Sequence, residues 1–316
     1  MKVLFLVLVF SCSRNPSSLS SKTTSSPKVT TIPWWNSLTH LNQLKPFKSK
    51  NIIIGIIDTG IDPKHPIFAN RLYTYDDTNN LIPISESSYG FNLTGPKLSF
   101  QPMDDVGHGT HVAGIIDNGT KLFPEIKFVI YKYYTNQKNA SIISTLTSTI
   151  RAIELATKHG VDVINYSAGG VEPSLAEKNA IDKAREKGII FVTAAGNDGK
   201  EIGGSYKYYP GSYNLSNIIT VGNTQENLKL HPSSNYSSQY VHIAAPGDRI
   251  LSTLPFNGFG TMTGTSQAAP FVTAAVAITK LHNNSFPMNS VLEKSSQSES
   301  LQDKIVKGSL LNFEKL

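Results

Sequence analysis

Residues 52–58 read Ile-Ile-Ile-Gly-Ile-Ile-Asp, an apolar run that ends in a carboxylate. A short run so rich in β-branched residues, followed by the turn signal Thr59-Gly60, is typical of a strand buried on both faces. Such strands occur in parallel sheets that are covered by helices on both sides. The segment therefore indicates an α/β fold, and it places Asp58 at the carboxyl end of a strand.

The sequence beyond this strand alternates between short apolar runs and longer amphipathic segments. Further strands are expected at 126–132, 161–164, 189–194, 218–221 and 241–244, and helices at 142–159, 175–187 and 266–281. Gly188 is the expected stop of the second helix, because glycine readily adopts the left-handed conformation at a helix end. The alternation predicts a three-layer α/β fold, a mainly parallel β-sheet flanked by helices on both faces.

Length and charge limit the number of domains and the kind of partner. The chain has 316 residues, of which 39% are hydrophobic and 16% charged, as in an ordinary globular protein with one large domain. Its 29 basic and 23 acidic residues give a formal net charge of +6, but the basic residues are scattered along the sequence. Nucleic acid is therefore not expected as a partner. A monomer is expected as well.

The first residues have the features of an export signal. Met1-Lys2 precedes the apolar run 3–10 and Ser11-Cys12, and this run is too short to span a bilayer. A cysteine directly after such a run resembles the bacterial lipoprotein signal, in which the cysteine becomes the lipid-modified first residue. We expect residues 1–12 to be a signal peptide, with two outcomes open: cleavage before Cys12 and attachment to the cell envelope, or simple secretion.

Cys12 is also the single cysteine of the chain. No disulfide within the chain and no cysteine nucleophile are therefore expected. Residues 13–49 are predicted to form a flexible tether, rich in Ser and Thr, and an N-terminal extension. Within this segment, residues 13–31 contain too few apolar residues to offset the entropy of ordering. The folded domain is expected to cover residues 50–316.

Asp58 and His108 are candidates for proton transfer. A carboxylate at a strand end can accept a proton from an imidazole and fix its orientation, although an Asp before Thr-Gly is by itself more often a turn former or helix cap. His108 lies between Gly107 and Gly109 at the expected start of a helix, and histidine can accept and return a proton near neutral pH. His111 raises the alternative of a metal pair, which the absence of a His-Glu-x-x-His pattern disfavours.

Ser266 is the candidate nucleophile. It stands in Gly264-Thr265-Ser266-Gln267-Ala268 at the start of an apolar helix, where the macrodipole and the free amides favour developing negative charge. Taken alone, a serine at a helix start is usually only an N-cap.

The three candidates occur in the chain order Asp, His, Ser. This order, together with the motifs Asp-Thr-Gly-Ile-Asp, His-Gly-Thr-His-Val-Ala-Gly and Gly-Thr-Ser-x-Ala, resembles the subtilisin-like serine protease family, the subtilases. The resemblance covers roughly residues 50–316, and 310–312 would correspond to the family's C-terminal helical region. It implies a serine endopeptidase that hydrolyses extended polypeptides, with Asp58, His108 and Ser266 as its catalytic triad.

Two further segments fit the same family. Ala194-Ala195-Gly196-Asn197-Asp198 resembles the segment that carries the oxyanion-hole asparagine, so Asn197 would donate to the oxyanion; the alternative is an asparagine that only serves a turn. Ser167, Ala168 and Gly169 correspond to the strand that pairs with the substrate backbone and walls the primary specificity pocket.

The resemblance leaves three points open. Tyr208 aligns with a position near the base of that pocket that is often held by a small residue, so it would either make the pocket shallow or point to solvent. Family members often bind structural calcium, but Asp76-Asp77 with Asn79-Asn80 lacks the spacing of an EF-hand loop, and no metal ligand is assigned. The segment before residue 50 is too short for the usual folded inhibitory propeptide.

The chemistry itself is expected to need no cofactor. The main alternative to an enzyme is a tethered surface protein that keeps the fold as a binding module, and a second alternative is a transferase that passes the acyl group to an amine. The presence of Asp58, His108, Ser266 and Asn197 together favours the peptidase.

Overall fold

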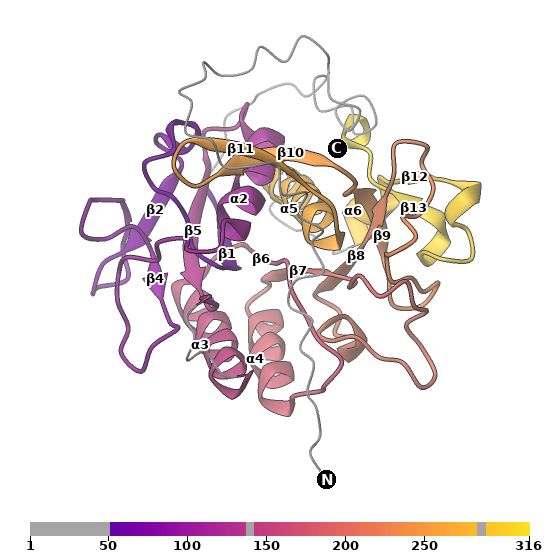
Figure 1. Ribbon diagram of the computed structural model, residues 1–316, viewed down its shortest axis with the longest axis horizontal. Coiled ribbons are helices and arrows are strands. Elements are labelled where there is room, and N and C mark those ends of the chain that lie inside the picture. The colour runs from indigo at the N-terminus through magenta and orange to yellow at the C-terminus, as the bar shows by residue number, and fades with distance from the viewer. Residues whose placement is uncertain (1–50, 137–141, 283–288) are drawn as a thin grey trace.

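One large sheet forms the middle layer of the molecule (Figure 1). The computed structural model describes residues 51–136, 142–282 and 289–316. The strands of the sheet are β1 (Ile52–Asp58), β2 (Leu72–Tyr75), β3 (Leu81–Pro83), β4 (Phe91–Asn92), β5 (Ile126–Lys132), β6 (Val163–Tyr166), β7 (Ile190–Ala194), β8 (Ile218–Thr224), β9 (Ile243–Pro246), β12 (Ser296–Gln297) and β13 (Ser309–Leu310).

The strand order is β12-β13-β9-β8-β7-β6-β1-β5-β2-β3, and β4 pairs with β5. All pairs from β13 to β2 are parallel, and the antiparallel pairs β2–β3 and β12–β13 lie at the two edges. The predicted mainly parallel sheet is confirmed.

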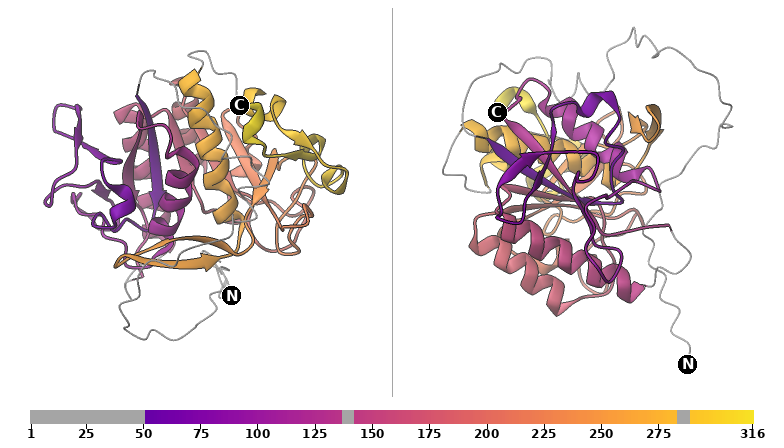
Figure 2. Two further views of the ribbon diagram at one scale, coloured as in Figure 1. Left: turned by 90° about the horizontal axis from the view of Figure 1, so that it is seen from above. Right: turned by 90° about the vertical axis from the view of Figure 1, so that its left-hand side faces the viewer.

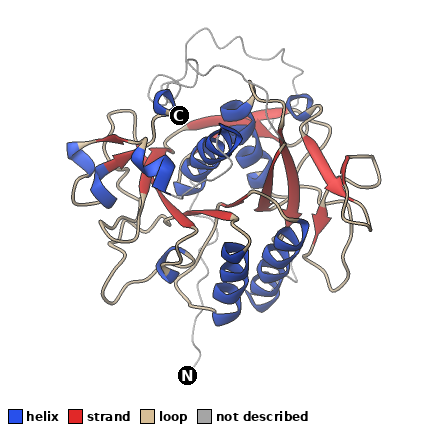
Figure 3. Cartoon of the chain, turned by 180° about the vertical axis from the view of Figure 1, so that it is seen from behind, coloured by secondary structure: helices blue, strands red, loops and turns tan. Residues whose placement is uncertain are grey.

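Helices cover both faces of this sheet (Figures 1 and 3). Helices α2 (His108–Thr120) and α5 (Thr265–His282) lie on one face, and α3 (Ile142–His159) and α4 (Leu175–Glu186) lie on the other, as the side views also show (Figure 2). The short α6 (Asn289–Glu293) follows α5. Short 3-10 helices span Pro66–Phe68, Gly211–Tyr213, Glu299–Leu301, Val306–Gly308 and Phe313–Lys315. The predicted three-layer α/β fold is confirmed.

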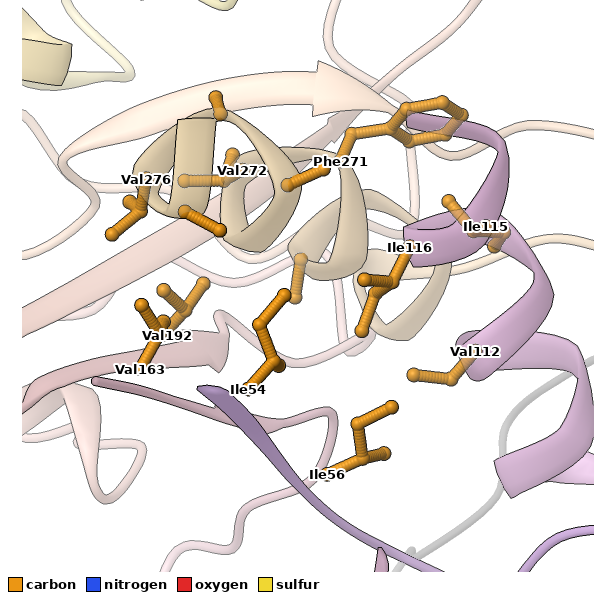
Figure 4. Packing of buried hydrophobic residues seen from close by; sticks show 14 of the residues in the cluster. Ile54, Ile56, Val112, Ile115, Ile116, Val163, Val192, Phe271, Val272 and Val276 are labelled. Carbon is orange, nitrogen blue, oxygen red and sulfur yellow. The ribbon is translucent and has the colours of Figure 1, made fainter. Parts of the chain in front are cut away.

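Strand β1 shows why the sheet needs both helical layers. Ile54 and Ile56 point to the α2 and α5 side, where they pack in one core cluster with residues such as Val112 and Phe271 (Figure 4). Ile57, on the opposite face, packs in the cluster under α3 and α4. Each of these isoleucines is fully buried, and burial of such a side chain contributes about 1.5–3 kcal/mol.

A hairpin outside the main sheet was not expected from the sequence. It consists of β10 (Ile250–Leu254) and β11 (Gly258–Met262), which pair antiparallel. Hydroxyl groups of Ser252 and Thr253 donate to the backbone carbonyls of His111 and Thr110, so the hairpin is fixed on α2. Strand β11 leads directly into α5 and therefore into Ser266.

The end of the chain differs from the expectation. Leu310 belongs to β13 and pairs with Ala244 of β9, so the element at 310–312 is not helical; only the 3-10 turn Phe313–Lys315 follows it. Within the described ranges, no helix combines the length and the apolar character that a membrane span requires. The predicted signal peptide, 1–12, and tether, 13–49, lie outside the described residues.

Candidate active site

The carboxyl ends of three neighbouring strands bring the predicted site residues together. Ile57 of β1 pairs with Tyr166 of β6, and Tyr166 pairs with Thr193 of β7. The residues that follow these positions, Asp58 and Ser167 among them, therefore stand side by side at one edge of the sheet, since neighbouring strands lie about 4.8 Å apart. The loop after β7 brings Asn197 to the same edge.

Asp58 and His108 form a buried hydrogen-bonded pair. His108 Nδ1 donates to Asp58 Oδ1 over 2.7 Å, and the backbone N–H of Thr59 donates to the same oxygen over 2.7 Å. His108 is the first residue of α2, after Gly107 with a φ of 93°, a left-handed conformation that suits glycine. This geometry fixes the imidazole, because one ring nitrogen is held by the carboxylate.

Two opposing effects act on the pKa of His108. Burial alone would lower it, since the charged imidazolium loses water. The charge and the hydrogen bond of Asp58, with a further contribution from Asp104, outweigh burial and raise the pKa of His108 above its ordinary 6.5. The surroundings therefore stabilise the protonated ring that would form when His108 takes a proton.

Asp104 supports this pair, although no sequence motif singled it out. Its Oδ1 accepts the Thr59 hydroxyl (2.7 Å) and the Gly107 N–H (2.8 Å), and its Oδ2 accepts the N–H and hydroxyl of Thr110 (2.8 and 2.6 Å). The Thr59 oxygen in turn accepts the Gly109 N–H over 2.8 Å. A single buried carboxylate thus satisfies amides at the start of α2 and ties that helix to the end of β1.

Ser266 and Ser167 are joined by two reciprocal hydrogen bonds. The Ser266 hydroxyl donates to the Ser167 carbonyl, and the Ser167 hydroxyl donates to the Ser266 carbonyl, both over 2.9 Å. The second bond satisfies the Ser266 carbonyl, which has no partner within α5 because Pro270, four residues later, has no N–H. Ser266 is therefore held next to the residue that adjoins Asp58 in the sheet.

A chain of buried polar groups extends from this serine pair into the core. Asn165 Nδ2 donates to the Ser167 hydroxyl over 3.0 Å, and the Thr273 hydroxyl donates to Asn165 Oδ1 over 2.7 Å. Sequence reasoning missed these residues, although a polar residue in the apolar run of β6 was a usable signal, because buried polar groups need partners. The chain positions the start of α5 against β6.

The side chain of Asn197 has a fixed orientation. Its Oδ1 accepts the N–H and the hydroxyl of Thr265, over 2.8 and 3.1 Å. The amide oxygen is therefore turned to the residue before Ser266, which leaves Nδ2 as a donor. A preorganised donor beside a hydroxyl is the arrangement that stabilises a developing oxyanion.

Ser167, Ala168 and Gly169 continue from β6 past Ser266. The next residue, Gly170, pairs in both directions with Tyr209, over 2.9 and 2.7 Å. The N–H and C=O of Gly169 bond to no other residue in the described part of the chain, and Gly169 is only half-buried. This short extended segment can therefore take up a further strand by backbone hydrogen bonds.

Tyr208 does not point to solvent. The residue is 8% exposed, and its ring belongs to a small core cluster with Ala195 and Ile202. The alternative of a solvent-facing side chain is therefore wrong.

The metal alternative for His111 is also wrong. His111 is fully buried, and its Nε2 lies 3.1 Å from the carbonyls of both Ile250 and Gly260 in the hairpin. Burial, with the neighbouring His108, lowers its pKa to about 3, so the ring is neutral. His111 holds the hairpin against α2.

The oxygen-rich cluster at residues 76–80 uses the carboxylate of Asp76 for its own turn. Asp76 Oδ1 accepts the N–H groups of Thr78 and Asn80, both over 2.9 Å. Among the residues that the structure describes, no three His, Cys, Asp or Glu side chains gather as ligands for a metal ion. Structural calcium stays a prediction without assigned ligands, and no step is derived from it.

Fold and site geometry agree with the comparisons to known proteins. The model of the subtilase family of peptidases matches residues 49–310, and the chain therefore belongs to that family. It is a serine peptidase, and its substrates are polypeptides.

Among individual relatives, subtilisin DY of Bacillus licheniformis is 34% identical over 242 residues, which are 75% of this chain and 79% of that protein. The major intracellular serine protease of Bacillus subtilis is 33% identical over 267 residues, 81% of this chain and 75% of that protein. The epidermin leader peptide processing serine protease of Staphylococcus aureus has a similar structure, with a TM-score of 0.70 and 25% identity over 89% of this chain and 79% of the other.

Proposed function

We propose that the protein is an endopeptidase whose nucleophile is Ser266. In this mechanism the Ser266 hydroxyl leaves the Ser167 carbonyl and attacks the peptide carbonyl while His108 takes its proton. His108 then gives the proton to the leaving amine, and a water molecule hydrolyses the acyl-enzyme by the same route. The observation that carries the proposal is the Asp58–His108 hydrogen bond of 2.7 Å, one strand away from the residue that holds Ser266.

The same proposal assigns Asn197 and the Ser266 N–H as donors to the oxyanion of the tetrahedral intermediate. Support comes from the two bonds of Thr265 to the Asn197 oxygen, which turn the amide nitrogen outward. A preorganised side-chain donor of this kind lowers the barrier by about 3 kcal/mol.

The substrate would lie as an extended strand against Ser167, Ala168 and Gly169. The open N–H and C=O of Gly169 support this, since they offer backbone hydrogen bonds that do not depend on sequence. The reaction as proposed needs no cofactor, and the protein would act as a monomer.

Export belongs to the proposal and rests on the sequence alone. Residues 1–12 would carry the export signal, residues 13–49 would form the tether, and residues 50–316 the peptidase domain. With a lipid on Cys12 the protein would be attached to the cell envelope, and without one it would be secreted. Intact mass of the mature protein from its host decides between them: an added diacylglycerol mass on an N-terminal Cys12 supports the lipoprotein.

The activity is tested with an unfolded protein as substrate and mass spectrometry of the products. Ser266→Ala is expected to reduce kcat by about 10⁶-fold. Asn197→Ala is expected to reduce kcat by about 10²–10³-fold with little change in KM, because its bond forms only in the transition state. The control Asn227→Ala removes an exposed asparagine and should change neither.

Products with free carboxyl ends support hydrolysis, whereas acyl groups joined to added amines would indicate a transferase. Full activity of Ser266→Ala would contradict the proposal.

A further inference from the structure

Two glycines beside the proposed nucleophile are in contact with one aromatic ring. A Cβ atom built on Gly169 would lie 2.5 Å from Tyr208 Cε1, and one built on Gly196 would lie 2.8 Å from Tyr208 Cε2 and Cζ. Cε1 and Cε2 are on opposite edges of the ring, so the tip of Tyr208 stands between the two backbone segments. Each Cβ would lie even closer to a further atom, the Tyr209 carbonyl oxygen at Gly169 and Asn235 Nδ2 at Gly196, so neither position has room for a side chain.

The loop that carries Tyr208 holds the ring in this place. The Tyr208 N–H donates to the Ser212 hydroxyl over 3.0 Å, and the Ser212 N–H donates to the Tyr208 carbonyl over 2.9 Å. Tyr209 is paired in both directions with Gly170. On the other side, Asn235 Nδ2 donates to the Ala195 carbonyl over 2.9 Å. Both segments and the ring between them therefore form one fixed unit.

The hydroxyl of Tyr208 is at the end of this buried ring, which is turned toward the two glycines. It makes no hydrogen bond to any other residue in the described ranges, and burial raises its pKa. Since Cε1, Cε2 and Cζ are at the two glycines, the phenol end of the ring fills the gap between them. In this position the ring forms the floor of the gap between the Gly169 and Gly196 segments.

The proposed mechanism fixes which part of the substrate meets this gap. The attacked carbonyl carbon is bonded to Ser266 Oγ, and its oxygen is bound by Asn197 Nδ2. The Cα of the same residue is about 1.5 Å from that carbon. Its side chain therefore starts beside Ser167–Gly169 on one side and Ala195–Asn197 on the other, the two segments between which Tyr208 stands.

From this geometry we infer that Tyr208 determines specificity and restricts the residue on the acyl side of the cleaved bond to Gly, Ala or Ser. The inference rests on the proposed function. A side chain with no more than two heavy atoms ends above the phenol, whereas a leucine or phenylalanine side chain would need the volume that the ring fills. Because the residues around Tyr208 are closely packed, the ring cannot move aside to make room for a large side chain.

The test uses two peptides that differ only in this residue, Ala in one and Phe in the other. The wild-type protein is expected to cleave the Ala peptide with a kcat/KM more than about 100-fold higher. Tyr208→Gly opens the gap, and the ratio is expected to fall by at least about 100-fold or to reverse. Tyr208→Phe keeps the ring and should keep the ratio.

A variant that folds poorly cannot imitate this result, because it lowers kcat/KM for both peptides together. Tyr73→Gly removes a ring from the far strand β2 and is the matched control, with an unchanged ratio. A wild-type protein that cleaves the Phe peptide as well as the Ala peptide would overturn the inference, and so would a Tyr208→Gly ratio equal to the wild-type ratio.

A binding measurement distinguishes failure of the proposed function from failure of the specificity inference. Ser266→Ala cannot form an acyl-enzyme, and its affinity for the two intact peptides is measured by calorimetry. Tighter binding of the Ala peptide supports the inference whether or not the wild-type protein cleaves it. Equal binding, or tighter binding of the Phe peptide, contradicts it.

Discussion

The charge balance at His108 decides the pH range in which the site can work. Asp58 and Asp104 raise the pKa of His108 above 6.5 against the effect of burial. The ring can act as a base only when it is neutral, so kcat/KM must fall as the pH drops through this raised pKa. Activity is therefore favoured at pH values above this raised pKa.

The first prediction concerns Asp104, a positioning residue. Asp104→Asn removes a charge that raises the pKa of His108, so the acid limb of the kcat/KM profile is expected to move to lower pH. The rate on the plateau should also fall, because Asn cannot accept all the bonds at the start of α2. The measurement is kcat/KM as a function of pH.

Asp182→Asn serves as the control, since Asp182 is exposed on α4 and pairs with Arg185. It should leave the acid limb in place. If the acid limb of the kcat/KM profile of Asp104→Asn coincides with that of the wild type, the charge of Asp104 does not affect the pKa of His108.

The start of α5 depends on buried polar groups that connect it to β6. Ser167 supplies the donor that Pro270 lacks, and Asn165 and Thr273 continue the connection. These groups fix Ser266 relative to β6. A substitution several residues away from Ser266 should therefore alter its position.

The second prediction tests this connection with Thr273→Val, which keeps the shape and removes the hydroxyl. Asn165 Oδ1 then loses its partner in a buried place, and the free energy of unfolding is expected to fall by about 1–3 kcal/mol. Thr279→Val is the matched control on the same helix, because the Thr279 hydroxyl only bonds back to Ala275. Equal losses in the two variants, measured by denaturant unfolding, would rule out a special role of Asn165.

Most elements were predictable because their patterns are local. The strand at 126–132 and the helix at 142–159 have the predicted bounds, and the helix from Leu175 ends at Glu186, two residues before Gly188 with its φ of 72°. The strand expected at 161–164 instead covers Val163–Tyr166. Just before it, the Asp162 side chain accepts the Ile53 N–H, and the Asp162 backbone pairs with Ile53 and Ile190.

The hairpin β10–β11 was missed because its strands contain few of the usual signals. Gly258 and Gly260 interrupt β11, and the turn places Phe256 and Asn257 at positive φ, 64° and 56°. The Asn257-Gly258 pair was the signal that could have revealed it, since Asn-Gly is common in hairpin turns.

The site as a whole needs the register of the sheet, which no local pattern contains. The sequence supplied Asp58, His108, Ser266 and Asn197 through a resemblance of motifs. The contributions of Asp104, Asn165 and Thr273 arise only when β1, β6, α2 and α5 are packed together, and so does the position of Tyr208 between two glycines.

The stability of the whole molecule should also depend on a buried carboxyl group on the far side of the sheet. Glu177 of α4 accepts a hydrogen bond from the Tyr213 hydroxyl over 2.7 Å, and burial raises its pKa to about 7 from 4.5. In the unfolded chain its pKa returns to the ordinary value. Between these two values the folded state binds more protons, so stability falls as the pH rises through this window.

The third prediction is that Glu177→Gln removes the fall in stability that the titration of Glu177 causes as the pH rises. Between pH 4.5 and pH 8 the free energy of unfolding of the wild type should fall by about 3 kcal/mol relative to that of the variant. The comparison between the two proteins cancels the other titrating groups. Parallel curves of unfolding free energy against pH would show that Glu177 titrates normally.

The proposed peptidase mechanism requires the Ser266 hydroxyl to be a nucleophile, and a fluorophosphonate probe tests this directly. The purified protein is treated with the probe, and the modified residue is located by mass spectrometry of its peptides. The predicted result is one adduct, on Ser266, that is absent in Ser266→Ala, strongly reduced in His108→Ala and retained in the exposed-serine control Ser87→Ala. An adduct on another residue, or a folded and processed protein that takes up no probe, would contradict the account.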